Sequence, residues 1–83
     1  MTTYGDWQHY INSSNQMKRY YCQSCQTNTA VLLYRYVTDG SGETHKEYQI
    51  TCEKCQKAGS LHYSKNLAEH GWNAVNTVGA NPS

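Results

Sequence analysis

The chain has 83 residues and a formal net charge of +1, which predicts one small domain whose modest core needs an additional staple. Large aliphatic side chains are scarce and Phe is absent, so eight Tyr and two Trp must supply much of the apolar area. No apolar run approaches the roughly 20 residues of a membrane span, and the chain lacks the strong basic excess typical of nucleic-acid-binding domains.

The first segment, residues 1–16, is a polar N-terminal arm. Tyr4, Trp7 and Ile11 recur at the spacing of one helical face, although Gly5 interrupts the pattern. We therefore expect an arm with a short helix, followed by a loop that ends at residue 16.

The middle of the chain has the pattern of a long β-hairpin. A short strand over residues 17–21 leads into Cys22, and residues 26–29 form the turn after the first cysteine pair. Residues 30–38 are rich in β-forming side chains, residues 39–43 (Asp-Gly-Ser-Gly-Glu) form a turn, and residues 44–52 form the second arm.

The register of this hairpin follows from its side chains. Centring the turn on Ser41 gives these cross-strand pairs: Ala30–Cys52, Leu32–Ile50, Leu33–Gln49, Tyr34–Tyr48, Arg35–Glu47 and Tyr36–Lys46. One face is then aliphatic and aromatic, and the other carries an opposite-charge pair, whereas a shift of one residue would mix the two faces.

The last part of the chain predicts a helix that covers the hairpin. Residues 57–59 form a turn, residues 60–63 form a short strand and Ser64 is the candidate N-cap. One helical face carries Leu67, Ala68, Gly71, Trp72 and Val75. We expect Trp72 to close a core made with Leu32, Tyr34, Tyr48 and Ile50, and Gly71 to allow close packing. Residues 79–83 are expected to form a disordered tail.

All four cysteines lie in two Cys-x-x-Cys motifs, Cys22-Gln-Ser-Cys25 and Cys52-Glu-Lys-Cys55. Two such pairs, with no cysteine left over, are typical of one structural Zn²⁺ held by four thiolates at about 2.3 Å. The spacer, residues 26–51, exceeds the common length of roughly 15–20 residues because it contains the long hairpin.

Two disulfides or a redox dithiol are the alternatives to zinc. Disulfides suit secreted domains, but the chain begins without an apolar signal segment, so we expect a reducing cytoplasm. A redox motif needs a βαβ context that the sequence does not show. The resulting prediction is a small α+β zinc ribbon: a long antiparallel hairpin with two zinc knuckles over residues 17–78, and a C-terminal helix packed on the sheet.

The second half of the chain resembles the restriction-alleviation Lar family of phage and prophage zinc ribbons. The resemblance is carried by Tyr48-Gln-Ile-Thr-Cys52-Glu-Lys-Cys55, Ala58-Gly59 and Asn66-Leu-Ala-Glu-His-Gly-Trp72-Asn73-Ala74. Family members often carry Pro inside the first knuckle and Gly after each second cysteine, where this chain has Ser24, Gln26 and Gln56. The resemblance implies a phage protein that acts in the cytoplasm of an infected bacterium and blunts type I restriction.

Three classes of function are open at this stage. The first is a non-enzymatic module that binds a host protein, such as a restriction-modification or other defence complex. The alternative is a nucleic-acid-binding zinc ribbon that regulates phage or host gene expression through Lys18, Arg19, Tyr20 and Tyr21. An enzyme is disfavoured because four cysteines close the metal shell, and the sequence has no nucleophile elbow, P-loop or paired-carboxylate motif. We expect no small-molecule substrate.

The candidate partner-binding residues are two tyrosines and two lysines: Tyr36, Tyr63, Lys54 and Lys57. Exposed aromatic side chains are enriched at protein interfaces. The basic residues near the knuckles (Lys18, Arg19, Lys54, Lys57 and Lys65) have the simpler role of offsetting the negative thiolate cluster. Four thiolates and one Zn²⁺ add −2, which brings the formal charge of +1 to −1.

Overall fold

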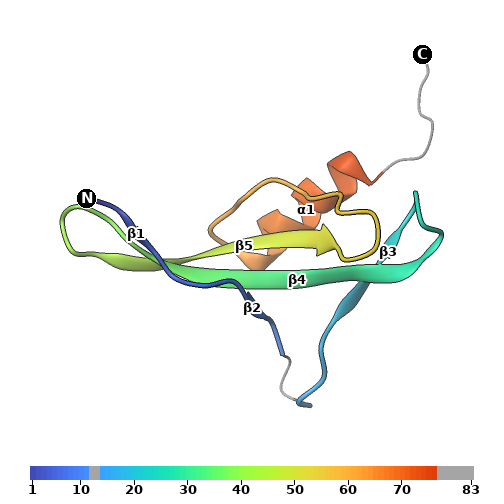
Figure 1. Cartoon of the computed structure of the whole chain (residues 1–83), viewed down its shortest axis with the longest axis horizontal. Helices are drawn as coiled ribbons and strands as arrows, with labels where there is room; N and C mark the ends of the chain where they lie inside the picture. Colours follow the sequence, from blue (N-terminus) through green and yellow to red (C-terminus); the bar gives the residue numbers. More distant parts are fainter. Residues whose placement is uncertain (12–13, 77–83) are drawn as a thin grey trace.

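The structure, a computed structural model, describes residues 1–11 and 14–76. Its elements in chain order are β1 (Thr3–Tyr4), β2 (Gln8–His9), β3 (Arg19–Cys22), β4 (Thr27–Thr38), β5 (Thr44–Cys52) and α1 (Lys65–Val75). All the strands join one antiparallel sheet around β4, and α1 lies along one side of it (Figure 1). The tail expected over residues 79–83 lies outside the described residues.

The hairpin of β4 and β5 has the register that the sequence predicts. Leu32 is opposite Ile50, Tyr34 is opposite Tyr48, and the remaining pairs run from Ala30–Cys52 to Thr38–Thr44. Arg35 and Glu47 meet on the second face, with 2.9 Å between Nη2 and Oε1. The expected turn at residues 26–29 is shorter than predicted, because Thr27 already pairs with Cys22 and begins β4.

The short helix expected in the N-terminal arm is wrong, because the arm forms β1 and β2 along the free edge of β4. Gly5 N donates to Tyr36 O at 2.7 Å and Tyr10 N donates to Leu32 O at 2.9 Å. Tyr4 and Trp7, whose spacing suggests a helical face, instead both stack on the guanidinium of Arg35. The Arg35 Cζ lies 4.4 Å from the ring centroid of Tyr4 and 4.5 Å from that of Trp7. The unsatisfied edge of β4 outweighs a weak local helix pattern.

Strand β3 pairs with the same edge of β4 as β1 and β2 do, but nearer the N-terminal end of β4. Arg19 is opposite Val31 and Tyr20 is opposite Ala30. Between β2 and β3, Ile11 and Met17 form an isolated antiparallel bridge. The N-terminus therefore lies beside the hairpin turn, and β3 brings the first cysteine pair to the opposite end of the sheet (Figure 1).

The short strand expected over residues 60–63 is also wrong as a continuous element. This segment runs along the outer edge of β5 but makes two isolated bridges, Thr51–Ala58 and Tyr48–His62. Gly59 N donates to Ile50 O at 2.9 Å, and a side chain at position 59 would place Cβ 3.0 Å from the backbone of Trp72. The approach of α1 therefore keeps this segment close to β5 without a regular ladder.

Helix α1 begins and packs as predicted. Ser64 is its N-cap, because the Ser64 side chain accepts a hydrogen bond from Leu67 N at 3.2 Å. Ala68, Gly71 and Trp72 are its buried residues. Leu67 and Val75 lie at the border of this face and are 50% and 37% exposed, respectively. The buried face of α1 is therefore narrower than expected.

The core lies between α1 and the half of the sheet near the cysteines. Its fully buried members are Cys22, Ala30, Leu32, Ile50, Cys52, Ala68 and Trp72. Trp72 is 1% exposed, and its Nε1 donates to Tyr21 O at 3.3 Å. Tyr48 packs against this cluster but is only partly buried. The core is thus continuous with the cysteine cluster, since two of its members are cysteines.

Candidate metal centre

Two tight turns carry the cysteines, one after β3 and one after β5. Gln26 N donates to Cys22 O at 2.7 Å, and Gln56 N donates to Cys52 O at 3.0 Å. Gln26 and Gln56 have φ values of 57° and 69°, in the left-handed region that favours Gly. Each Gln costs about 1 kcal/mol there relative to Gly, so the same turn geometry forms without the glycines that the resemblance leads one to expect.

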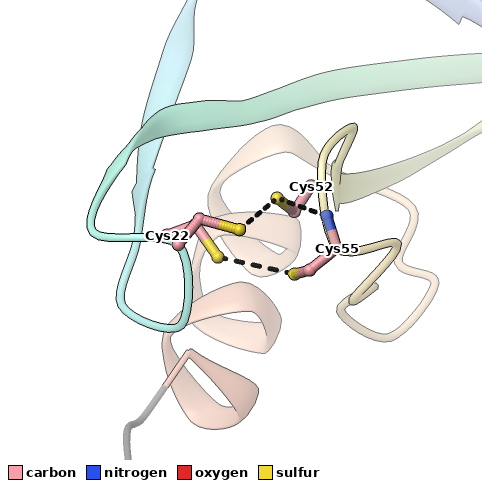
Figure 2. A group of neighbouring side chains, drawn as sticks. Cys22, Cys52 and Cys55 are labelled. Atoms are coloured by element: carbon pink, nitrogen blue, oxygen red, sulfur yellow. Dashed lines mark hydrogen bonds between the residues drawn. The ribbon is translucent and has the colours of Figure 1, made fainter.

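The four cysteine sulfurs come together between these turns. Cys22 Sγ lies 3.7 Å from Cys55 Sγ, Cys25 Sγ lies 3.7 Å from Cys52 Sγ, and all four sulfurs lie within 4.8 Å of one another. Figure 2 shows Cys22 reaching the cluster from the first turn, and Cys52 and Cys55 reaching it from the second. The hairpin register produces this meeting, because it holds the ends of β3 and β5 on either side of β4.

These spacings fit a tetrahedral metal site. Four ligands at about 2.3 Å from one ion lie about 3.8 Å from one another in a regular tetrahedron. A disulfide requires an S–S distance of about 2.05 Å, and all four cysteines are free. Within residues 1–11 and 14–76, no other group of three or more His, Cys, Asp or Glu side chains is placed to hold a metal ion. The cluster is therefore compatible with one structural ion bound by sulfur alone.

Cys52 has the surroundings of a thiolate. Burial opposes its ionisation, but the Thr29 hydroxyl at 3.1 Å and the amides of Cys55 and Lys54 at 3.4 Å outweigh that effect and lower the pKa of Cys52 to about 6. Donors aimed at sulfur stabilise its negative charge and orient it toward a metal. Burial and the neighbouring thiols raise the pKa of Cys25, so a cation bound in the cluster would favour its thiolate form.

Several residues that hold the site do not follow from the cysteine motifs. Asn76, after the end of α1, accepts a hydrogen bond from Gln23 N at 2.7 Å and donates to Tyr21 O at 2.8 Å. Asn76 therefore ties the helix to the first turn. The predicted register could have revealed Thr29, which directly precedes the Ala30–Cys52 pair, whereas nothing in the sequence places Asn76 there.

The four candidate partner-binding residues lie at opposite ends of the sheet. Tyr36 is 45% exposed and Tyr63 is 69% exposed, and the Tyr63 ring lies 4.9 Å from that of His45 near the hairpin turn. Lys54 and Lys57 belong to the second cysteine turn, where Lys57 Nζ donates to Ser24 Oγ at 2.8 Å. His45 and Cys52 are seven residue steps apart along β5, about 23 Å, so the tyrosines and lysines form two surfaces and not one.

No helix among the described residues is both long enough and apolar enough to cross a membrane. Comparisons with family models, with curated proteins and with solved structures give no match to this chain.

Proposed function

We propose that this chain is a small zinc ribbon in which one structural Zn²⁺, bound by Cys22, Cys25, Cys52 and Cys55, supports a surface for protein binding. The observation that carries the proposal is the group of four sulfurs at near-tetrahedral spacing. Zn²⁺ is the usual ion of four-thiolate sites of this kind. The ion would join the two turns that end β3 and β5, and its binding energy would count toward folding.

The chemistry of the site favours a structural role over catalysis. A catalytic zinc keeps an open position for water or substrate, whereas four sulfur ligands occupy the tetrahedron. Cys22 and Cys52 are fully buried beside Trp72, so the ion would sit against the core. The protein is accordingly proposed to act without chemistry of its own.

Charge pairing favours a protein partner over nucleic acid. Lys18 and Lys65 both contact Glu69, with Nζ–Oε2 distances of 3.4 Å and 3.5 Å, and Arg19 lies 3.7 Å from Glu53. Cations near the thiolates are therefore partly offset by carboxylates. Affinity for DNA or RNA depends on many unpaired Lys and Arg side chains that displace counterions, and a formal charge near −1 with zinc bound does not supply them.

The partner that we propose is a host protein of the restriction-modification machinery or another defence complex, met in the cytoplasm of an infected bacterium. This part rests on the resemblance of the second half of the chain to the Lar family. The exposed rings of Tyr36 and Tyr63 supply the kind of side chain that dominates protein interfaces.

Elemental analysis tests the metal, and a plating assay tests the host role. Purified protein should contain one zinc per chain. A restricting host that expresses the protein should plate unmodified phage more efficiently, and Tyr36→Ala or Tyr63→Ala should reduce this gain. Tyr21→Ala is a matched control, because Tyr21 is also 45% exposed but lies beside the first cysteine turn. Unchanged plating, together with a shifted nucleic-acid probe at physiological salt, would replace this role with gene regulation.

A further inference from the structure

A pocket of about 320 Å³ opens on the sheet where β2 pairs with β4. It is lined by Gln8, His9, Tyr10, Ile11, Tyr34 and Lys46. Gln8 is opposite Tyr34 in the register and therefore lies on the same face of the sheet, the face that α1 covers nearer the cysteines. The pocket exists because the arm pairs with β4, so a helical arm would not have formed it.

Lys46 gives this pocket its charge. Its Nζ lies 5.1 Å from the ring centroid of Tyr34 and 5.5 Å from that of Tyr36. Within residues 1–11 and 14–76, Lys46 pairs with no carboxylate, in contrast to Lys18, Lys65, Arg19 and Arg35. The two rings hold the ammonium group on the sheet surface without neutralising it.

The remaining lining adds donors and apolar surface but no acid. The Tyr34 hydroxyl donates to Gln8 Oε1 at 3.4 Å, so the nitrogen end of the Gln8 amide is left to donate. Ile11 is 53% exposed at the rim. The His9 ring contacts Glu53 at 3.3 Å and is thereby held toward the cysteine end. A ligand that matches this lining carries one negative group beside an apolar one.

We infer that this pocket binds an acidic side chain in an extended segment of the protein partner, with its carboxylate beside Lys46 and an adjacent apolar side chain on Ile11 and Tyr34. The inference rests on the proposed function in one respect, that the partner is a protein. A single cation suits one carboxylate, whereas a nucleic-acid strand needs a row of cations along its phosphates. The volume of about 320 Å³ is at the lower end for ligand pockets, which suits a side chain and its neighbour.

The test is a titration of zinc-loaded, ¹⁵N-labelled protein with a blocked hexapeptide that alternates Glu with Leu. We expect saturable shift changes in the amides of Gln8 to Ile11, Tyr34 and Lys46. The matched peptide that alternates Gln with Leu should bind at least fivefold more weakly. Lys46→Gln should weaken the acidic peptide at least fivefold, and Lys46→Arg should restore most of the affinity. Lys65→Gln, which removes a lysine at the start of α1, is the control and should bind like the wild type.

Three results would overturn the inference. The neutral peptide could bind equally well, Lys46→Gln could bind the acidic peptide undiminished, or the shifts could map to the cysteine turns. If octathymidylate binds the same pocket more tightly than the acidic peptide at equal salt, the surface belongs to single-stranded nucleic acid. If the chemical shifts change with protein concentration in the absence of peptide, the surface belongs to a second copy of the chain. Because the titration involves no host factor, its failure is distinct from a failure of the plating assay.

Discussion

The half of the sheet next to the cysteines and the half next to the hairpin turn are stabilised in different ways. The cysteine half packs α1 on fully buried residues that include Leu32, Ile50 and Trp72. In the turn half, Arg35 lies on the rings of Tyr4 and Trp7, and these cation–aromatic contacts share that face with the buried Val37. Apolar burial and the proposed metal binding would be lost together if the metal were removed, whereas cation–aromatic contacts persist in water. The buried core lies in the cysteine half, and the proposed binding residues Tyr36, Tyr63 and Lys46 lie nearer the hairpin turn.

Loss of the metal should give the largest effect. Cys52→Ser, or chelation of the wild type at neutral pH, should collapse amide dispersion in a proton–nitrogen spectrum, because structural zinc contributes about 10–16 kcal/mol of apparent binding energy to folding in small domains. Ser24→Ala, in the first cysteine turn, removes no ligand and should keep both zinc and dispersion. A spectrum that stays fully dispersed after verified zinc removal would show that the core folds alone.

Removal of Trp72 tests the core without touching a ligand. Trp72→Ala should destabilise the domain by about 3–5 kcal/mol, because the side chain is 1% exposed and its loss leaves a cavity beside Cys22 and Cys52. Val75→Ala, on the same helix but 37% exposed, should cost less than about 1 kcal/mol. Similar melting temperatures for the two variants, measured with zinc bound, would contradict this account of the core.

Gly71→Ala distinguishes close packing from helix propensity. In an open helix the change gains about 1 kcal/mol. Here a Cβ at position 71 would lie 2.7 Å from Ser60 Oγ and 2.9 Å from His62 Nε2, so we expect a loss of about 1–3 kcal/mol in urea unfolding. Ser60→Gly in the same background should recover part of the loss. A Gly71→Ala protein more stable than the wild type would mean that residues 60–62 move away from the added Cβ at little cost in free energy.

The contact between Tyr20 and Glu69 predicts a pH dependence. The Tyr20 hydroxyl donates a hydrogen bond to Glu69 Oε2. Burial is the larger cause, and this hydrogen bond the second, that raises the pKa of Tyr20 above its usual value of 10. The same hydrogen bond lowers the pKa of Glu69. Because the pKa of Tyr20 is higher in the folded than in the unfolded chain, the contribution of this contact to the free energy of unfolding is complete below pH 10 and is lost as the pH rises above 10. Tyr20→Phe should cost about 1–1.5 kcal/mol at neutral pH, and its difference in melting temperature from the wild type should shrink above pH 10. A constant difference would contradict this assignment.

The sequence predicts the elements in which apolar and polar side chains alternate or recur at a regular spacing. It does not predict the elements that form because backbone N–H and C=O groups at a strand edge need hydrogen-bond partners. Alternation along residues 30–52 determines the register because a shift would bury Arg35 and expose Leu32. The Cys-x-x-Cys spacing predicts the cysteine cluster. The side-chain pattern of the arm indicates a helix, but the free edge of β4, which the sequence does not reveal, draws Gly5 and Tyr10 into hydrogen bonds. The sequence does not predict the role of Asn76, because its partners, Tyr21 and Gln23, are distant in sequence.

The smallest effect tests whether the two halves are independent. Trp7→Leu keeps an apolar side chain but removes one of the two rings on Arg35, which should cost about 0.5–1 kcal/mol. Arg35 still pairs with Glu47, so no buried charge is orphaned and the hairpin should stay closed. Hydrogen exchange should therefore accelerate at the amides of Gly5 and Tyr10, which bond the arm to β4, and stay unchanged at Gly59, which bonds Ile50 in the core. Equal acceleration at all three amides would mean that the arm and the core open as one unit, and the division between a stabilising half and a proposed recognition half would fail.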